Sequence, residues 1–248
     1  MNFDENVYEY LDGKSFSSGL NVTISHPEDT ISNRFDLLEE MVKGKHIIHI
    51  GCVDHLPLID QKIKNNLWLH SRLCQKSKRC FGVDINSDGI NYIRDIKGYK
   101  DVVCADITSD DIIEIKNNMW DYMLLGEILE HVDNPCYFLS SIQKKYSNVV
   151  NRLIITVPNA FSYLNIKYAL KHTECINSDH KYWFTPYTLA KLATMSNMKI
   201  ERFEFCEPVA INENFPSKVI NWRYYVYYKP LIKRYPSMRE TLVMVLKL

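Results

Sequence analysis

The chain has 248 residues, of which 46% are hydrophobic and 24% are charged, enough apolar material for one large domain or two small ones. Its 30 basic and 30 acidic residues give a formal net charge of zero, so no field of one sign attracts a nucleic acid or an acidic membrane. Charge alone therefore argues against a nucleic acid as the partner.

The N-terminal sequence and the cysteines indicate a cytoplasmic protein. Residues 1–13, MNFDENVYEYLDG, are acidic and lack the apolar stretch of a signal peptide. No apolar run reaches the ~18 residues that a membrane span needs. The seven cysteines include no CxxC pair, and several fall in apolar runs, so we expect small buried side chains in a reducing compartment.

Apolar runs and helical periods alternate along most of the chain. Residues 1–33 lack a clear period, and we expect an N-terminal arm with limited structure. The predicted strands are 46–50, 80–84, 101–104, 122–125, 152–157, 198–205 and 241–248. The predicted helices are 34–42, 59–73, one capped by Asn86 or Ser87, one capped by Ser109, 135–146 and 186–195.

This rhythm predicts a single α/β domain over residues 34–248. We expect a doubly wound, Rossmann-like sheet of seven mostly parallel strands with helices on both faces. Two segments, 159–184 and 207–235, break the rhythm with aromatic and polar residues and are predicted to be inserts or lid-like. No internal repeat or domain linker interrupts the pattern.

Three acidic residues stand where the first predicted strands end, namely Asp54, Asp84 and Asp106. A carboxylate after the second strand can accept hydrogen bonds from two ribose hydroxyls, and one after the third can accept from an adenine amino group. Each acid alone is more simply explained as a helix cap. Three of them in register favour a nucleotide-like ligand.

The stretch WDYMLLGEILEHVDNP, residues 120–135, begins as a buried strand and turns polar at Gly126 and Glu127. Glu127, Glu130 and His131 follow at spacings of three and four, which would place them on one face of a single helical turn. Ligands bind at the carboxyl ends of the strands in open α/β sheets. This stretch is therefore the main candidate for the functional site.

The segments HIIHIGCVDH, GVDIN, CADIT, WDYMLLGEILEHVDNP and RLIITVPNA, in this order, resemble motifs of class I S-adenosylmethionine-dependent methyltransferases. The similarity is greatest to the ubiquinone-pathway and sugar O-methyltransferases and covers roughly residues 34–205, with 241–248 as the family's antiparallel seventh strand. It implies S-adenosylmethionine as the cofactor, with Gly51 to His55 under the methionine part, Asp84 at the ribose, and Asp106 and Ile107 at the adenine. The other residues that the resemblance places at the cofactor are His49, Cys52, Val53, Asp54, Ile85 and Gly126.

The first motif departs from the family pattern at three positions. His49 replaces the usual acid, and Val53 and His55 stand where the second and third glycines usually lie. Because glycine lets a backbone approach a ligand closely, we expect the loop to follow a different path, or else to bind the cofactor weakly or not at all. We favour a variant loop that still binds.

A second resemblance concerns a metal. Glu127-x-x-Glu130-His131, followed by Asp179-His180, is similar to the metal-binding pattern of small-RNA 3′-terminal 2′-O-methyltransferases, and ubiquinone O-methyltransferases place a histidine similarly. It implies that Glu127, Glu130, His131 and His180 are the catalytic residues and hold a divalent metal such as Mg²⁺, Mn²⁺, Co²⁺ or Zn²⁺. A metal would lower the pKa of an acceptor hydroxyl.

Two alternatives to the metal stay open. His131 could act as a metal-free general base, or Glu127 could contact the cofactor while Glu130 and His131 only position it.

These patterns predict methyl transfer from S-adenosylmethionine to a hydroxyl of a sugar, a polysaccharide precursor or another small molecule. One alternative is 2′-O-methylation of an RNA end. Another is a non-catalytic binding or scaffold protein that has kept the fold with a degenerate cofactor loop. The acceptor and the oligomeric state do not follow from the sequence.

Overall fold

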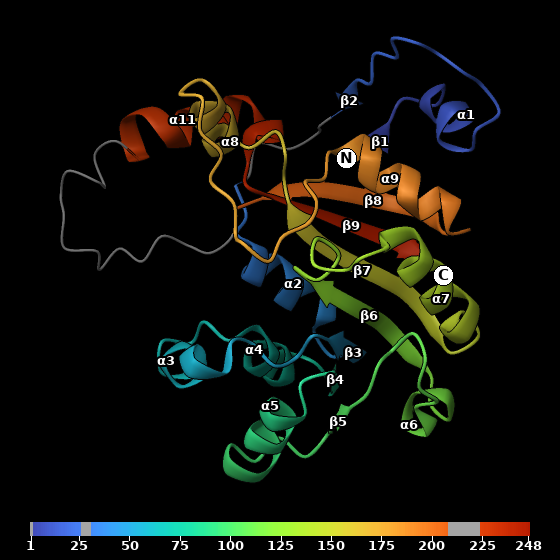
Figure 1. The fold of residues 1–248 in the computed structure, drawn as a ribbon, viewed down its shortest axis with the longest axis vertical. Coiled ribbons are helices and arrows are strands. Elements are labelled where there is room, and N and C mark those ends of the chain that lie inside the picture. Colours follow the sequence, from blue (N-terminus) through green and yellow to red (C-terminus); the bar gives the residue numbers. More distant parts are fainter. Residues whose placement is uncertain (1, 26–30, 208–223) are drawn as a thin grey trace.

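The computed structural model describes residues 2–25, 31–207 and 224–248, and its centre is a seven-stranded sheet (Figure 1). The strand order is β5-β4-β3-β6-β7-β9-β8. The strands are β3 (His46–Ile50), β4 (Arg79–Asp84), β5 (Val102–Cys104), β6 (Trp120–Gly126), β7 (Val150–Pro158), β8 (Lys199–Cys206) and β9 (Thr241–Lys247). Strands β3 to β7 pair in parallel, whereas β9 runs antiparallel to both β7 and β8. The predicted fold class and the antiparallel last strand are confirmed.

The central strands are buried on both faces, which explains their continuous apolar sequences. Met123 and Leu125 of β6 point into one core cluster, and Leu124 between them points into the other. Ile154 of β7 joins Leu124 on that second face. Successive side chains of one strand therefore supply the cores on the two faces of the sheet.

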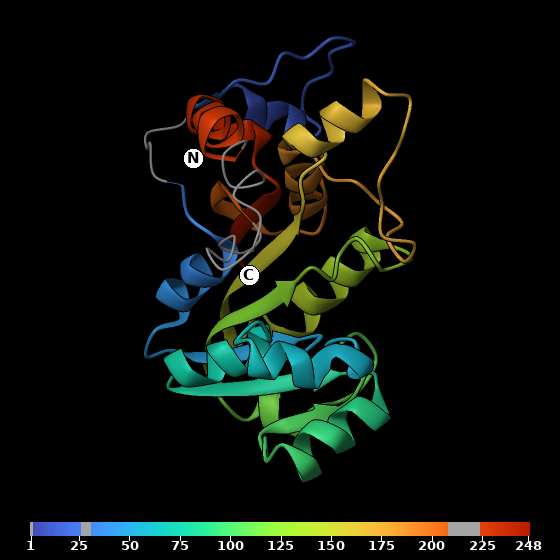
Figure 2. The same ribbon diagram turned by 90° about the vertical axis from the view of Figure 1, so that its left-hand side faces the viewer.

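Helices cover both faces of the sheet. On one face lie α7 (Pro135–Tyr146), α9 (Pro186–Met195) and the short α6 (Ile113–Lys116), and on the other lie α2 (Arg34–Val42) and α4 (Leu69–Lys76). Figures 1 and 2 show α3 (Ile59–Lys64), α4 and α5 (Ser87–Asn91) gathered at the β4–β5 end of the sheet. The predicted bounds of α2, α7 and α9 are confirmed, and Asn86 caps α5 as expected.

Two helix predictions were wrong. The single helix expected over 59–73 is broken into α3 and α4, because Asn66 adopts a left-handed conformation with φ of 54° that ends a helix. The break lets Trp68 turn inward, where its indole Nε1 donates to the carbonyl of Cys52 at 3.1 Å. Ser109 caps no helix, since α6 begins only at Ile113.

The N-terminal arm has more structure than expected. Strand β1 (Asn2–Phe3) pairs with β2 (Ile24–Ser25), and α1 (Val7–Leu11) packs against α9. Phe3, Val7 and Leu11 belong to the main core cluster, and the Lys191 ammonium donates to the last carbonyls of α1. The spacing of four between these three apolar residues was the missed signal.

The predicted insert 159–184 contains α8 (Tyr163–Ala169), and the end of the predicted insert 207–235 contains η3 (Tyr224–Tyr228) and α11 (Lys229–Arg234). The rings of Tyr163 and Tyr228 lie 5.6 Å apart, so the two inserts contact each other. Residues 208–223 of the second insert lie outside the described residues. Three further short turns are η1 (Leu56–Leu58), η2 (Tyr92–Ile96) and η4 (Pro236–Met238). None of the described helices is long and apolar enough to cross a membrane.

Candidate functional site

The candidate site lies at the edge of the sheet where the parallel strands end. Ile50 of β3 is in register with Val83 of β4 and with Leu125 of β6, so the three strands reach this edge at the same level. The loop after β3 begins with residues 51–55, the polar end of the first motif, and is called the first-motif loop. Asp84 stands at the end of β4, and the loop after β6 carries the Glu127–His131 stretch. The edge is the one at which open α/β sheets bind their ligands.

Asp84 at the end of β4 holds the first-motif loop. Its carboxylate accepts from the backbone N–H of Val53 at 2.8 Å and of Asn86 at 3.0 Å. Burial raises the pKa of Asp84, and these hydrogen bonds oppose that rise. The backbone N–H of Ile85 also lowers the pKa of Asp84, and because an ionised carboxylate can accept about four hydrogen bonds, Asp84 retains capacity for a further hydroxyl donor.

The valine that replaces the second motif glycine is accommodated by a glycine elsewhere. A Cβ at Gly89 of α5 would lie 2.3 Å from Val53 Cγ1, so the side chain of Val53 occupies the space that Gly89 leaves open. Gly51 keeps a left-handed φ of 71°, and a Cβ there would lie 2.2 Å from Ile128 Cδ1. The loop is therefore closely packed, and a glycine is required at position 51.

The other predicted cofactor residues fall into two groups. One group lies at the same strand edge and consists of Asp54, His55, Ile85, Asp106 and Gly126. The carboxylate of Asp54 accepts from Lys62 Nζ at 2.5 Å, and Ile85 is 78% exposed. The others have buried side chains.

Three predicted side chains are buried. Ile107 is only 3% exposed and lies in the main core, so only its main chain can face an adenine. Cys52 is buried in the small cluster under α3 and α5. His49 is buried with its Nδ1 3.1 Å from Nδ1 of His70 on α4, and burial, followed by the charge of His70, lowers its pKa well below the usual value.

Glu127 is not on a helix, contrary to the prediction. It has a left-handed φ of 59°, and residues 127–134 form turns before α7 begins. Its carboxylate forms an ion pair with Arg34 at 2.9 Å and accepts from the Thr156 hydroxyl at 3.0 Å. Arg34 is separated from Glu127 by 93 positions, so no local sequence signal could reveal this contact.

The structure does bring Glu130, His131 and His180 together. One nitrogen of each imidazole and one Glu130 carboxylate oxygen lie within 4.8 Å of one another. His180 Nε2 is 4.0 Å from Glu130 Oε1, and the rings of His131 and His180 meet edge to face at 4.7 Å. Three of the four predicted metal ligands thus converge; Glu127 pairs with Arg34 and is not in this group, although its charge acts on both Glu130 and His180.

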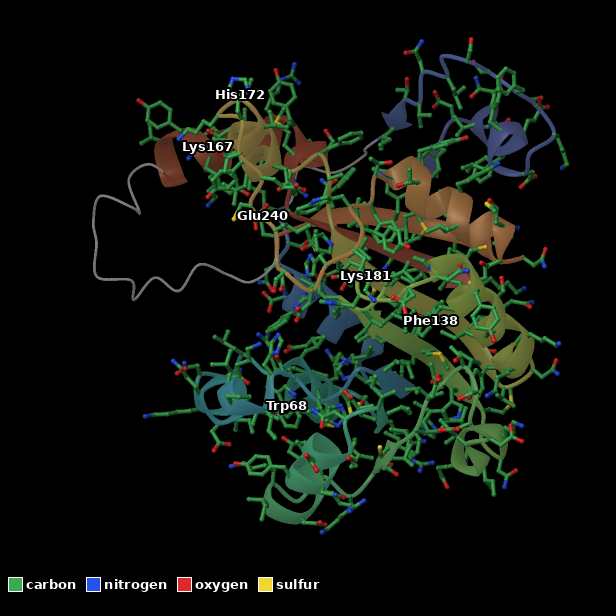
Figure 3. All side chains as sticks on the ribbon, viewed as in Figure 1. Trp68, Phe138, Lys167, His172, Lys181 and Glu240 are labelled. Atoms are coloured by element: carbon green, nitrogen blue, oxygen red, sulfur yellow. The ribbon has the colours of Figure 1, made fainter. Side chains whose placement is uncertain are left out.

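Hydrogen bonds hold His180 against this cluster although it is distant in sequence. The Lys181 N–H donates to the carbonyl of Glu130 at 2.8 Å, and Tyr182 Oη donates to the carbonyl of Asp133 at 2.7 Å. The Lys181 ammonium also pairs with Asp133 at 2.5 Å. Figure 3 shows Lys181 well apart from Trp68.

The carboxylate of Glu130 has an environment that suits a cation. It is 0% exposed, and neither of its oxygens has a hydrogen-bond partner among the described residues; the same is true of His180 Nδ1. Burial, followed by the charge of Glu127, raises the pKa of Glu130 to about 8. A buried carboxylate without a partner is costly, and a cation relieves that cost. One carboxylate and two imidazoles are ligands that Mn²⁺, Co²⁺ or Zn²⁺ accept, so the residues fit such an ion.

Comparison of the sequence with family models and with curated protein sequences gave no match. Solved structures do share the fold. The small RNA methyltransferase HEN1 aligns with a TM-score of 0.55 and 14% identity over 92% of this chain and 27% of its own. Magnesium protoporphyrin IX methyltransferase from Synechocystis PCC 6803, with bound SAH, aligns with a TM-score of 0.51 and 10% identity over 86% of this chain and 81% of its own. A putative S-adenosylmethionine-dependent methyltransferase from Listeria monocytogenes aligns with a TM-score of 0.51 and 11% identity over 86% of this chain and 95% of its own. The chain therefore spans about a quarter of the length of HEN1.

Proposed function

We propose that this protein is an S-adenosylmethionine-dependent O-methyltransferase in which a divalent cation assists transfer to a sugar hydroxyl. The observation that carries the proposal is the unpaired, buried carboxylate of Glu130, which lies with His131 and His180 at the strand edge that also carries Asp84. The fold, shared with solved methyltransferases, supports the choice of cofactor.

The cofactor site is the loop between β3 and α3 together with the end of β4. Asp84 would accept from the ribose hydroxyls, and the backbone at Gly51 would adjoin the methionine part. S-adenosylmethionine, when bound, would supply an electrophilic methyl group. The side chain of Val53 packs against Gly89 of α5, and this packing supports binding of the cofactor despite the valine.

Glu130, His131 and His180 would hold the cation, which would lower the pKa of the acceptor hydroxyl when bound. The chain itself sets the tautomer of His131. Its Nδ1 lies 3.2 Å from the carbonyl oxygen of Asp179, which only accepts, so Nδ1 carries the proton and Nε2 is the basic nitrogen. Arg34 and Thr156 fix the carboxylate of Glu127 beside this group, where it can accept a hydrogen bond from the substrate hydroxyl.

A carbohydrate or other small hydroxylated acceptor is the first choice. The zero net charge of the chain supports it, because a long polyanion would require a basic surface. The second candidate is the terminal ribose of an RNA, favoured by the structural similarity to the small RNA methyltransferase HEN1 and by the Glu/Glu/His/His pattern.

The test is transfer of a labelled methyl group from S-adenosylmethionine to two acceptor panels, sugars with short glycans and small RNAs with free 3′ ends. We expect transfer to a sugar, its loss in chelator and its recovery with Mn²⁺. The variant Glu130→Gln should abolish the metal response, whereas the exposed Glu40→Gln on α2 should not. Transfer only to RNA would select the second candidate. Activity that persists in chelator and in Glu130→Gln would refute the role of the cation.

A further inference from the structure

A second group of metal-ligand side chains lies on the opposite side of the first-motif loop. His70 and Cys74 are four residues apart on α4, so their side chains lie on one face, and Cys80 faces them from β4. His70 Nε2 lies 3.6 Å from Cys74 Sγ, and His70 Nδ1 lies 3.7 Å from Cys80 Sγ. One ligand atom from each residue lies within 4.8 Å of the other two.

The separation of His70 Nε2 from Cys74 Sγ matches that around a small tetrahedral ion, whereas the 3.7 Å to Cys80 Sγ is measured from His70 Nδ1, the nitrogen that faces His49. With Zn–S of about 2.3 Å and Zn–N of about 2.0–2.1 Å, neighbouring sulfur and nitrogen ligands of a tetrahedral zinc lie roughly 3.6 Å apart. Two thiolates and an imidazole prefer zinc over hard cations such as Mg²⁺ or Ca²⁺. The donor set therefore differs in kind from the carboxylate and imidazoles at Glu130.

The surroundings favour an ion over simple packing. His49 Nδ1 lies 3.1 Å from His70 Nδ1, a hydrogen bond that fixes the His70 ring and leaves its Nε2 for an ion. A Cβ at Gly82 would lie 2.9 Å from His70 Cε1, so glycine is needed beside the cluster. His70 and Cys80 are buried, whereas Cys74 is partly exposed and provides a route of entry.

We propose that His70, Cys74 and Cys80 bind Zn²⁺ or a similar thiophilic divalent cation, with the fourth position open on the side of Cys74. The ion ties α4 to β4 behind the cofactor loop and is independent of the proposed methyl transfer. The spacing His70-x3-Cys74-x5-Cys80 contains no CxxC pair, so the site is visible only once α4 is placed on β4. Cys80 is buried in an apolar cluster and Cys74 packs against that cluster, as the sequence predicts for small side chains, and the proposal gives both a second role.

The first test is Co²⁺ binding to the full chain, reduced and freed of metal with a chelator. One equivalent of Co²⁺ should produce thiolate-to-cobalt charge-transfer absorption, and Zn²⁺ should displace it. The absorption should be lost in Cys74→Ser and Cys80→Ser. It should persist in Cys175→Ser, an exposed cysteine outside the cluster, and in Glu130→Gln, which alters only the other candidate site. Absorption that survives Cys74→Ser would overturn the proposal.

A second measurement needs no variant. At free Zn²⁺ ten times the dissociation constant, alkylation of Cys74 should slow about tenfold, because only about a tenth of the sites remain empty, while Cys175 should be unaffected. Unchanged alkylation of Cys74, or a Cys74–Cys80 disulfide that excludes metal even in reductant, would contradict the assignment.

Discussion

Replacement of Glu130 by glutamine tests the buried carboxylate directly. Glutamine has nearly the same shape as glutamate but cannot ionise. Glu130 is 0% exposed and its oxygens have no partner among the described residues, so its charge is costly whenever no cation is bound. In the metal-free protein, the substitution should therefore stabilise the fold at neutral and alkaline pH.

The magnitude follows from the pKa of Glu130. Its usual value of 4.5 applies to the unfolded chain, and burial raises it to about 8 in the folded protein. Between these values the folded state binds more protons, so the stability of the wild-type protein falls as pH rises through this window. At about 1.4 kcal/mol per pKa unit, the free energy of unfolding of the wild-type protein falls by at most about 5 kcal/mol. The free energy of unfolding of the glutamine variant does not change for this reason, because glutamine does not ionise.

Urea unfolding in chelator at pH values from 5 to 9 measures this difference. The wild-type protein should lose stability relative to Glu130→Gln between pH 5 and 8, and the difference should level off above pH 8. With Mn²⁺ at 100 times its dissociation constant, the wild-type protein should regain about 2.7 kcal/mol, and the variant should not. Parallel pH profiles in chelator, or equal stabilisation of both proteins by Mn²⁺, would refute the reasoning.

Two further substitutions test other parts of the structure. Gly89→Ala should destabilise the protein by ~1–3 kcal/mol in urea, because its Cβ would lie 2.3 Å from Val53 Cγ1, and the penalty should shrink in a Val53→Ala background. An equal penalty in both backgrounds would show that the valine does not occupy this space. Glu207, buried directly after the end of β8, has its pKa raised to about 7 by burial, so Glu207→Gln should gain up to about 3 kcal/mol over the wild-type protein as pH rises from 4.5 to 7. A stability difference that does not change with pH in urea unfolding would contradict this prediction.

The fold could be predicted because its signals are local. Each parallel strand is a short apolar run followed by a polar loop, and α7 and α9 begin at capping residues, Asn134 and Thr185, that precede a proline. The secondary-structure predictions were wrong where tertiary contacts determine whether a segment is helical. Trp68 enters a buried pocket and breaks an otherwise continuous helical pattern, and α1 becomes stable by packing against α9.

Part of the candidate site could also be predicted from local sequence signals. Glu130 and His131 are adjacent in sequence, and the resemblance supplied His180. The pairing of Glu127 with Arg34 depends on where α2 docks, and nothing near either residue encodes it. The contact between Val53 and Gly89 likewise joins two loops that only the assembled sheet brings together.

Calorimetric titration of the protein with S-adenosylhomocysteine tests the central claim most directly. We expect one molecule to bind per chain, and Asp84→Asn to weaken binding about 10- to 100-fold, since a hydrogen bond to a charged acceptor contributes roughly 1.5–3 kcal/mol. The exposed Asp88→Asn, four residues away on α5, should bind like the wild-type protein. Absence of binding with and without Mn²⁺, in a protein that unfolds cooperatively, would contradict the account and leave the methyltransferase fold without its cofactor.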